Sequence, residues 1–396
     1  MKTPVVAGVI LLLVLPTALP LMPGDPNAAE HSLPAFPAEN VPRRQTLTIA
    51  LLDSVIPSFT SPPEMEAILD GYTWTAGTTY TFSIRWLGDA AITGGALTRG
   101  VDVLVIPGIG KEFRRPVFFS GPWKTAIRQF VAHGGGYFGT CGGANMGAQG
   151  LVEPKQRGWK SWTAWEWCMH RSALGLATVL SYQDMADPGA SSLQGTPERV
   201  GQSAYIWYNL SIEGSGLCQR CPINASHPIF AGYEGQSCIM RWVGGPALIP
   251  ASGNVAVLAW YPAENMSGPH GNASTQVHAW RFDGGNVAQP LDFWDPTDRV
   301  IETHLAGKPA GIASTYGRGR VVLFGNHPEH PAWEGGRLVE DDGPRDHMLL
   351  KGLFSWEDRR PLPVDYNWWL VRRSVAWVAG VPDDELPPVA EGGNVY

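Results

Sequence analysis

The chain has 396 residues, enough for one large domain or two smaller ones with a full hydrophobic core. Its formal net charge is −7 and it has no basic run, which argues against nucleic acid as a partner. Only 16% of the residues are charged, while 47 glycines, 34 prolines and 17 tryptophans indicate a folded, loop-rich and aromatic-rich protein.

The N-terminus has the composition of an export signal. Lys2 precedes an apolar run from Val5 to Met22, and polar, proline-rich sequence follows. We therefore predict a signal peptide over residues 1–22 and a linker over residues 23–45. The run is also of borderline length for a membrane span, so an uncleaved anchor is the alternative. Either reading predicts an exported protein, secreted or anchored in the membrane on the extracellular side.

Glycosylation sequons agree with export. Asn-x-Ser sequences begin at Asn209, Asn224, Asn265 and Asn272. Each sequon is a weak signal alone because such triplets arise often by chance.

The cysteines also suit an oxidising compartment. Four of the five cluster in the middle of the chain, namely Cys168, Cys218, Cys221 and Cys238. In an exported protein these four are disulfide candidates that can form two bonds and leave Cys141 free. Three pairings are possible, and the sequence does not choose among them. A redox pair or a zinc site at Cys218 and Cys221 is the lower-ranked alternative, because no second Cys-x-x-Cys accompanies it.

The first part of the chain alternates buried-strand signals with helix signals. Apolar or alternating stretches predict strands at residues 47–53, 79–87, 101–110 and 134–141. Cap, proline and glycine signals predict helices at residues 62–71 and 122–133. This alternation predicts an α/β fold of the flavodoxin-like kind, with a mostly parallel sheet and helices on both faces.

The middle and the end of the chain are predicted in less detail. We expect a Trp- and Cys-rich insertion at about 151–254, where four tryptophans crowd together: Trp159, Trp162, Trp165 and Trp167. They indicate either core packing or the wall of a substrate pocket. The main domain is expected to span 46–380, with residues 381–396 as a frayed tail. Its later elements are predicted as strands at 255–261, 310–316 and 320–326 and helices at 346–354 and 368–378.

Cys141 is the first candidate for chemistry. It follows an apolar, aromatic strand and is enclosed by glycines, which permit a sharp turn into a helix. A thiol at a helix N-terminus is favoured as a thiolate by the unpaired N–H groups there. A buried cysteine in a glycine-rich turn is the alternative. A second apolar strand ends in His327 and Glu329, so the sequence offers a nucleophile, a base and a group that orients the base.

A second predicted strand end lies close to this site. Sites in parallel sheets form at the carboxyl ends of strands, where the turn at Gly108, Ile109 and Gly110 also falls. The backbone N–H groups of this turn and of Gly142 are therefore candidates for binding a substrate oxyanion. The alternative is that this turn only ends the strand and has no functional role.

The strand ends at Gly108, Cys141 and His327 resemble those of the class I glutamine amidotransferase superfamily. Within it, residues 307–329 are most similar to the biotin–protein ligase N-terminal domain family, and the likeness covers about 47–150 and 255–380. The resemblance implies a Cys–His–Glu triad, with Cys141 as nucleophile, His327 as general base and acid, and Glu329 as its orienting carboxylate. It implies no cofactor and no metal.

The sequence also departs from the superfamily. Residues 142–146 replace the Gly-x-Gly-x-Gln sequence that surrounds the nucleophile in its glutaminases, and biotin transfer is not implied. We therefore carry two hypotheses. The first is an exported cysteine hydrolase, or amidase, that acts on an amide or related carbonyl of a small molecule or peptide. The second is a non-catalytic module on the same fold that binds a ligand or a partner. The sequence gives no oligomeric state.

Overall fold

The computed structural model of the chain describes ten stretches, residues 43–53, 61–108, 115–157, 164–182, 217–243, 245–262, 276–282, 294–302, 305–340 and 354–389. All of them fall in one compact unit, Pro42–Tyr396. The other unit, Met1–Val41, lies outside the described residues, and the predicted signal or anchor lies there too. Within the described stretches, no helix combines the length and the apolar composition needed to cross a membrane.

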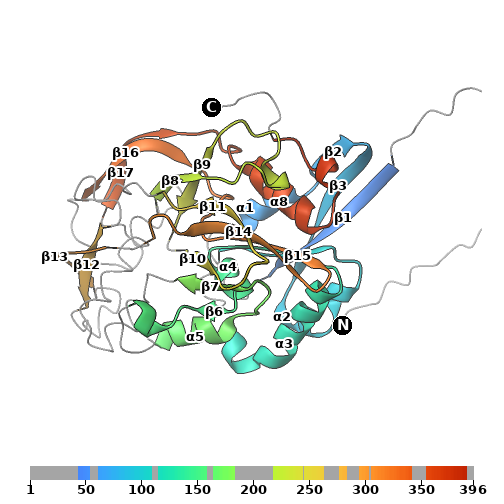
Figure 1. Cartoon of the computed structure of the whole chain (residues 1–396), viewed down its shortest axis with the longest axis horizontal. Helices are drawn as coiled ribbons and strands as arrows, with labels where there is room; N and C mark the ends of the chain where they lie inside the picture. The colour runs from blue at the N-terminus through green and yellow to red at the C-terminus, as the bar shows by residue number, and fades with distance from the viewer. Residues whose placement is uncertain are drawn as a thin grey trace, which may run out of the picture. The chain divides into compact units, whose positions relative to one another are not determined.

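An eight-stranded sheet forms the centre of this unit, in the order β11-β14-β15-β5-β4-β1-β3-β2. Figure 1 shows β1, β3 and β2 side by side at one end of this order. Its strands are β1 (Arg43–Leu52), β2 (Thr73–Ala76), β3 (Thr78–Leu87), β4 (Val103–Ile106), β5 (Gly136–Thr140), β11 (Ala256–Trp260), β14 (Pro309–Tyr316) and β15 (Gly319–Phe324). The five central strands, from β15 to β3, run parallel. The outer pairs β2–β3, β14–β15 and β11–β14 are antiparallel. The prediction of an α/β fold with a mostly parallel sheet is confirmed.

Strands β4, β5 and β15, and β1 from Leu47 onward, bury both of their faces. Along β1, Leu47, Ile49 and Leu51 belong to one core, whereas Ala50 and Leu52 belong to the other. Side chains alternate between the faces of a strand, so a strand covered on both sides reads as a continuous apolar run. This explains why β1 and β4 could be predicted from the sequence.

Helices supply the residues that cover the two faces. Apolar residues of α1 (Ser61–Leu69) and α8 (Trp368–Val378) pack in the first core. Those of α2 (Asp89–Thr93) and α3 (Arg115–Ala132) pack in the second. The expected start of the second helix is wrong: α3 begins seven residues before Pro122, which lies inside it. The missing N–H of a proline costs one helical hydrogen bond, and the helix nevertheless continues.

Residues 151–254 are integrated into the same two cores. Their described elements are β6 (Gly150–Leu151), α5 (Ala164–Ser172), β7 (Val179–Tyr182), β8 (Leu217–Pro222), β9 (Ser237–Trp242) and β10 (Ala247–Pro250). Phe230 and Trp242 pack in the first core, and Leu174 and Leu248 pack in the second. The described part of the predicted insertion therefore does not stand apart from the domain.

The remaining described elements are short. They are α4 (Gly142–Gly147), β12 (Gln276–Phe282), β13 (Trp294–Glu302), β16 (Trp333–Glu340), β17 (Phe354–Pro361) and 3-10 turns at Ala96–Thr98, Pro154–Arg157, Pro228–Phe230 and Asp383–Glu385. The helix expected at 346–354 lies outside the described residues except for Phe354, which begins β17.

The last described residues of the chain pack against the rest of the domain. Leu386 is only 6% exposed, and the carbonyl of Glu385 accepts a hydrogen bond of 2.8 Å from the Trp74 indole N–H. A buried apolar residue and a long-range hydrogen bond hold this segment against the hairpin β2–β3. The expectation of a frayed tail is therefore wrong as far as residue 389.

Candidate active site

Cys141 occupies a strained turn between β5 and α4. Its backbone has φ 47° and ψ −105°, and it is one of two non-glycine residues with positive φ in the described chain. Such a conformation costs about 1–3 kcal/mol and persists only where the surroundings enforce it. Gly143 is required for the turn, because a Cβ there would lie 1.7 Å from the carbonyl oxygen of Ile106. The glycines of the elbow thus bring helix α4 against β4 and leave the cysteine at the strand end.

Parallel pairing brings the second candidate loop to the same place. Phe324 of β15 pairs in register with Thr140 of β5, and its carbonyl accepts the Cys141 N–H at 2.7 Å. Both strands end there, so the loop carrying His327 leaves the sheet at the edge where Cys141 lies. This register, together with the strand ends, explains why residues 186 positions apart (327 − 141) meet.

His327 and Glu329 form a buried pair. The Nδ1 atom of His327 lies 2.9 Å from Oε1 of Glu329, and both side chains are nearly inaccessible to solvent. The Thr140 hydroxyl donates to the same carboxylate oxygen at 2.9 Å. Thr140 was missed by the sequence analysis. Its only signal was its position immediately before the cysteine, on the strand that pairs with β15.

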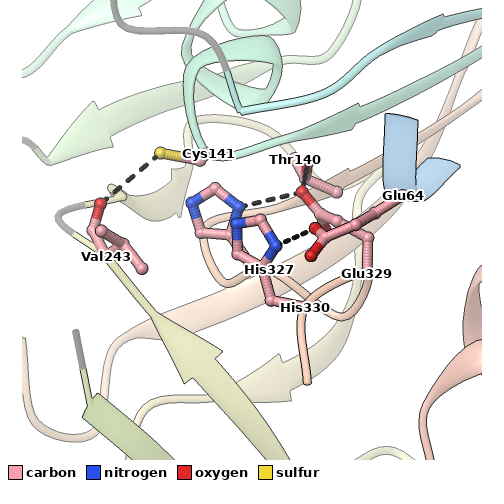
Figure 2. A network of polar contacts seen from close by, with 7 residues as sticks. All are labelled: Glu64, Thr140, Cys141, Val243, His327, Glu329 and His330. Atoms are coloured by element: carbon pink, nitrogen blue, oxygen red, sulfur yellow. Dashed lines mark hydrogen bonds and ion pairs between the residues drawn. The ribbon is translucent and has the colours of Figure 1, made fainter. Parts of the chain in front are cut away.

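Cys141 lies on the other side of the His327 ring. It acts on the ring electrostatically and favours the protonated imidazole. Figure 2 shows the sulfur on one side of the imidazole and the carboxylate on the other. Burial alone lowers the pKa of His327, but the negative charges of Cys141 and Glu329 outweigh burial and raise it. Burial raises the pKa of Glu329, and the charge of His327 more than reverses this. Both influences favour the imidazolium form of His327.

Strand β9 and the residue after it contribute backbone atoms to the site. The Val243 carbonyl accepts the Cys141 thiol at 3.8 Å, and the Arg241 carbonyl accepts the His327 N–H at 2.7 Å. An isolated β-bridge joins Arg241 and His327. Both contacts come from residues 151–254, which the sequence analysis treated as an insertion without a role in the triad.

The predicted oxyanion donors are described only in part. Gly142 begins α4 directly after the cysteine. Gly108 lies against the base, because a Cβ on it would be 2.1 Å from Cε1 of His327. Ile109 and Gly110 lie outside the described residues. The structure therefore gives Gly108 a packing contact with His327, and an oxyanion role for this turn stays a prediction.

A second histidine lies beside the first. The His330 ring stacks on the His327 ring with centroids 4.5 Å apart, and its Nδ1 bonds to the Glu64 carboxylate (Figure 2). Donor atoms of His327, Glu329 and His330 lie within 4.8 Å of one another, a spacing that can also hold a metal ion. In this arrangement the Nδ1 atoms are instead engaged by carboxylates, and His327 also faces the thiol. Together with Glu64, these residues form an acid–base cluster.

The predicted disulfides are not formed among the described cysteines. Cys218, Cys221 and Cys238 carry free thiols, and the side chain of Cys168 lies outside the described residues. Cys218 and Cys221 are three residues apart on β8, so they face opposite sides of the strand and cannot form the Cys-x-x-Cys redox or zinc pair. Burial raises the pKa of Cys218 to about 12 and that of Cys238 to about 12, so neither is a thiolate at neutral pH.

Most of the predicted glycosylation sites are not described. Asn209, Asn265 and Asn272 lie outside the described residues. The Nδ2 atom of Asn224, to which a glycan would be attached, donates to the Val257 carbonyl at 3.1 Å. This contact ties the amide to strand β11.

The expected tryptophan wall is described only at Trp167. This side chain is 46% exposed, and the guanidinium of Arg171 lies 5.8 Å from its ring. Trp159 and Trp162 lie outside the described residues, as does the side chain of Trp165. Trp167 is neither core packing nor part of the described cluster around Cys141.

The fold and the site together define an α/β protein with a cysteine, a histidine and a glutamate gathered at the carboxyl edge of its parallel strands. No protein-family model and no curated protein matches the sequence. Among solved structures, a GMP synthase-type protein from Thermoplasma acidophilum is 9% identical, with 85% of this chain and 95% of that one covered and a TM-score of 0.37. A glutamine amidotransferase is 12% identical, with coverages of 71% and 90% and a TM-score of 0.35.

A β-galactosidase from Bacillus circulans also matches, at 10% identity with a TM-score of 0.32, and the match covers 71% of this chain and 28% of that one. Likenesses this distant carry no weight for function. The resemblance to the biotin–protein ligase N-terminal domain family stays a prediction.

Proposed function

We propose that the chain is a cysteine hydrolase of the amidase type, acting on an amide or related carbonyl. Cys141 is the nucleophile, His327 the general base and acid, and Glu329 the carboxylate that orients the base. The observation that supports this proposal best is the order of three groups in space: the Cys141 sulfur lies on one side of the His327 ring and the Glu329 carboxylate on the other, with Oε1 of Glu329 2.9 Å from Nδ1 of His327 (Figure 2). A nucleophile, a base and a carboxylate that orients the base, placed in this order, are what activation of a weak nucleophile requires.

The chemistry follows from these contacts. The Cys141 thiolate attacks the substrate carbonyl carbon, and the carbonyl electron pair moves onto oxygen to give a tetrahedral oxyanion. Protonated His327 then donates its proton to the leaving amine as the C–N bond breaks, which leaves a thioester on Cys141. Neutral His327 next accepts a proton from water, whose oxygen attacks the thioester and releases the acid and the thiolate. Glu329 stabilises the imidazolium whenever it forms.

The proposal assigns the first oxyanion donor to the backbone N–H of Gly142. This group follows the nucleophile directly, as in other elbows of this geometry. The sequence resemblance of the Cys141 elbow and of the His327-Pro328-Glu329 strand end to the class I glutamine amidotransferase superfamily supports an amide substrate. The residues after the elbow depart from the glutaminase pattern, so we propose a small-molecule or peptide amide other than glutamine.

We further propose that the enzyme acts outside the cell, as a secreted or membrane-anchored protein. The apolar run from Val5 to Met22 and the four sequons support this location. Expression in cells with the native N-terminus, followed by N-terminal sequencing of the exported material, tests whether the run is cleaved.

Alkylation kinetics of Cys141 test the proposed chemistry. Iodoacetamide rates are measured against pH for the native protein and for His327→Ala, with a panel of amides and peptides screened in parallel. A Cys141 that reacts rapidly at neutral pH and slows in the variant supports the triad. A rate that is indifferent to His327 contradicts it.

One contact favours a second candidate, a binding module without turnover. The Val243 carbonyl occupies a hydrogen-bonding position next to the Cys141 sulfur. In this contact the thiol is the hydrogen-bond donor, and a thiol that keeps its proton is a poor nucleophile. Slow alkylation at neutral pH that is indifferent to His327→Ala, combined with retention of a ligand from the amide panel, would favour the binding module.

A further inference from the structure

The loop after β15 holds two histidines in one tight turn. The His330 N–H donates to the carbonyl of His327 at 3.2 Å, and Pro328 occupies the second position of the turn. Proline favours that position because its φ is fixed near −65°. Residues one and four of such a turn lie close together, so the two rings meet face to face, at 4.5 Å and 15°. The stacking is thus a product of the local sequence His-Pro-Glu-His.

Helix α1 reaches this turn from the other end of the sequence. Glu64 lies in the first turn of α1, and its Oε2 atom bonds to Nδ1 of His330. The His330 side chain is 7% exposed and that of Glu64 is 23% exposed. A carboxylate therefore fixes the outer ring by its Nδ1 atom, in the same way as Glu329 fixes the inner ring.

Burial, more than the surrounding charges, keeps the outer pair neutral. Burial lowers the pKa of His330 well below its ordinary value, and the positive charges of His327 and Arg241 act in the same direction, against the charge of Glu329. Burial raises the pKa of Glu64 to about 8, helped by Glu329 and opposed by His327 and Arg241. At neutral pH the two groups then share one proton without net charge. A second imidazolium at 4.5 Å from the first would repel it strongly.

The inner ring needs support on its face. The bond from Nδ1 to Glu329 fixes the direction of the His327 ring, but the ring can still tilt about that bond. Gly108 lies against Cε1, the ring edge between the two nitrogens. The His330 ring covers one face of the imidazole. Tilt of the base is costly because proton transfer depends on alignment with the sulfur.

We infer that His330 and Glu64 are positioning residues for the general base: Glu64 orients the His330 ring, which stacks on His327 and holds its plane toward Cys141. This inference rests on the proposed function, since it assigns a task to groups behind the proposed base. Neither residue touches the thiol or a substrate in this assignment.

The test compares iodoacetamide alkylation of Cys141 across a pH series in matched variants. Glu64→Ala and His330→Ala are expected to lower the rate at neutral pH about tenfold, the size of effect typical for residues that orient a reactive group. Glu64→Gln keeps a neutral hydrogen-bonding partner for His330 and is expected to stay within about twofold of the native rate. The pH midpoint separates positioning from bulk packing: misplacement of the base is expected to shift the midpoint in Glu64→Ala, whereas loss of packing alone would lower the rate without moving it.

His330→Phe completes the set, because it keeps a stacked ring and removes the bond to Glu64. An intermediate rate, with a shifted pH midpoint, is expected. Thermal unfolding of each variant verifies that it is folded, and the Glu64 pair alone decides the question if the His330 variants do not fold. Native-like rates in both alanine variants, with a normal loss in His327→Ala, overturn this inference and leave the proposed function intact. A native rate that is also indifferent to His327→Ala overturns both.

Discussion

The Nδ1 nitrogen of His327 and the Oε1 oxygen of Glu329 lie 2.9 Å apart in a site from which solvent is almost excluded. The same oxygen accepts the hydroxyl of Thr140, so one carboxylate atom joins the end of β5 to the loop after β15. Low polarity strengthens these interactions and makes the loss of either partner expensive. The contact therefore matters both for the stability of the sheet edge and for the protonation of the base.

Replacement of Glu329 by glutamine is the most direct test of the pair. The variant removes the negative charge that raises the pKa of His327, so that pKa falls. We expect the alkaline limit of Cys141 alkylation to move to lower pH, with a rate loss of about tenfold to a hundredfold at neutral pH. Alkylation against pH measures both effects. An unchanged profile would show that the carboxylate does not act on the base.

Replacement of Gly108 by alanine is expected to displace the base. The new Cβ would lie 2.1 Å from Cε1 of His327, so the ring or the strand end has to move. Overpacking of this kind costs about 1–3 kcal/mol, and alkylation of Cys141 should slow as well. Gly121→Ala in α3 is the matched control, because nothing lies within 4 Å of its Cβ and alanine favours the helix by about 1 kcal/mol. Urea denaturation and alkylation rates on both variants decide the matter, and equal stability of the two would contradict the prediction.

Replacement of Thr140 by valine tests the hydroxyl that the sequence analysis overlooked. Valine keeps the shape and the strand preference but removes the donor to Glu329, leaving part of a buried carboxylate without its partner. Hydrogen bonds to charged groups contribute about 1.5–3 kcal/mol, and we expect a loss of that order in the free energy of unfolding at neutral pH. Thr140→Ser retains the hydroxyl and should lose less. A valine variant as stable as the serine variant would mean that the hydroxyl contributes little.

The pH dependence of stability should reveal Glu64. Its pKa in the folded protein is about 8, above the ordinary value near 4.3, so the folded state binds the proton more tightly. Its contribution is present at low pH and is lost as pH rises from about 5 through about 8. Glu64→Gln cannot ionise, so the difference in unfolding free energy, variant minus native, should grow over this range. Urea titrations at about pH 5, 7 and 9 span this window and measure it, and a constant difference would contradict the assignment.

Local chemistry made the strands and the elbow predictable. Strands β4, β5 and β15, and β1 from Leu47 onward, are buried on both faces and are mostly apolar in sequence. The elbow is marked by glycines that its backbone requires, and the His-Pro-Glu sequence follows an apolar strand. Since parallel strands present their carboxyl ends at one edge, the meeting of Cys141 and His327 was a reasonable expectation.

Long-range contacts were beyond a reading of local patterns. Glu64 bonds to a residue 266 positions away, and in the sequence it looked like an ordinary acidic residue in the first turn of a helix. The backbone carbonyls of Arg241 and Val243 carry no signature at all, because every residue has a carbonyl. The lower-ranked alternative of a Cys-x-x-Cys pair has a related weakness. The spacing of Cys218 and Cys221 does not reveal that they lie on a strand, where residues three apart face opposite sides.

The bridge between Arg241 and His327 has a consequence for how the protein matures. The loop that carries the base is completed only when a hairpin from the middle of the chain has docked on strands from both ends. Contacts between such distant segments form slowly, since the closure entropy of long loops must be overcome first. Refolding should therefore yield a phase with native-like secondary structure and an unreactive cysteine, followed by a slower phase in which reactivity appears. The reactivity of the Cys141 thiol would then measure the last step in the folding of the domain.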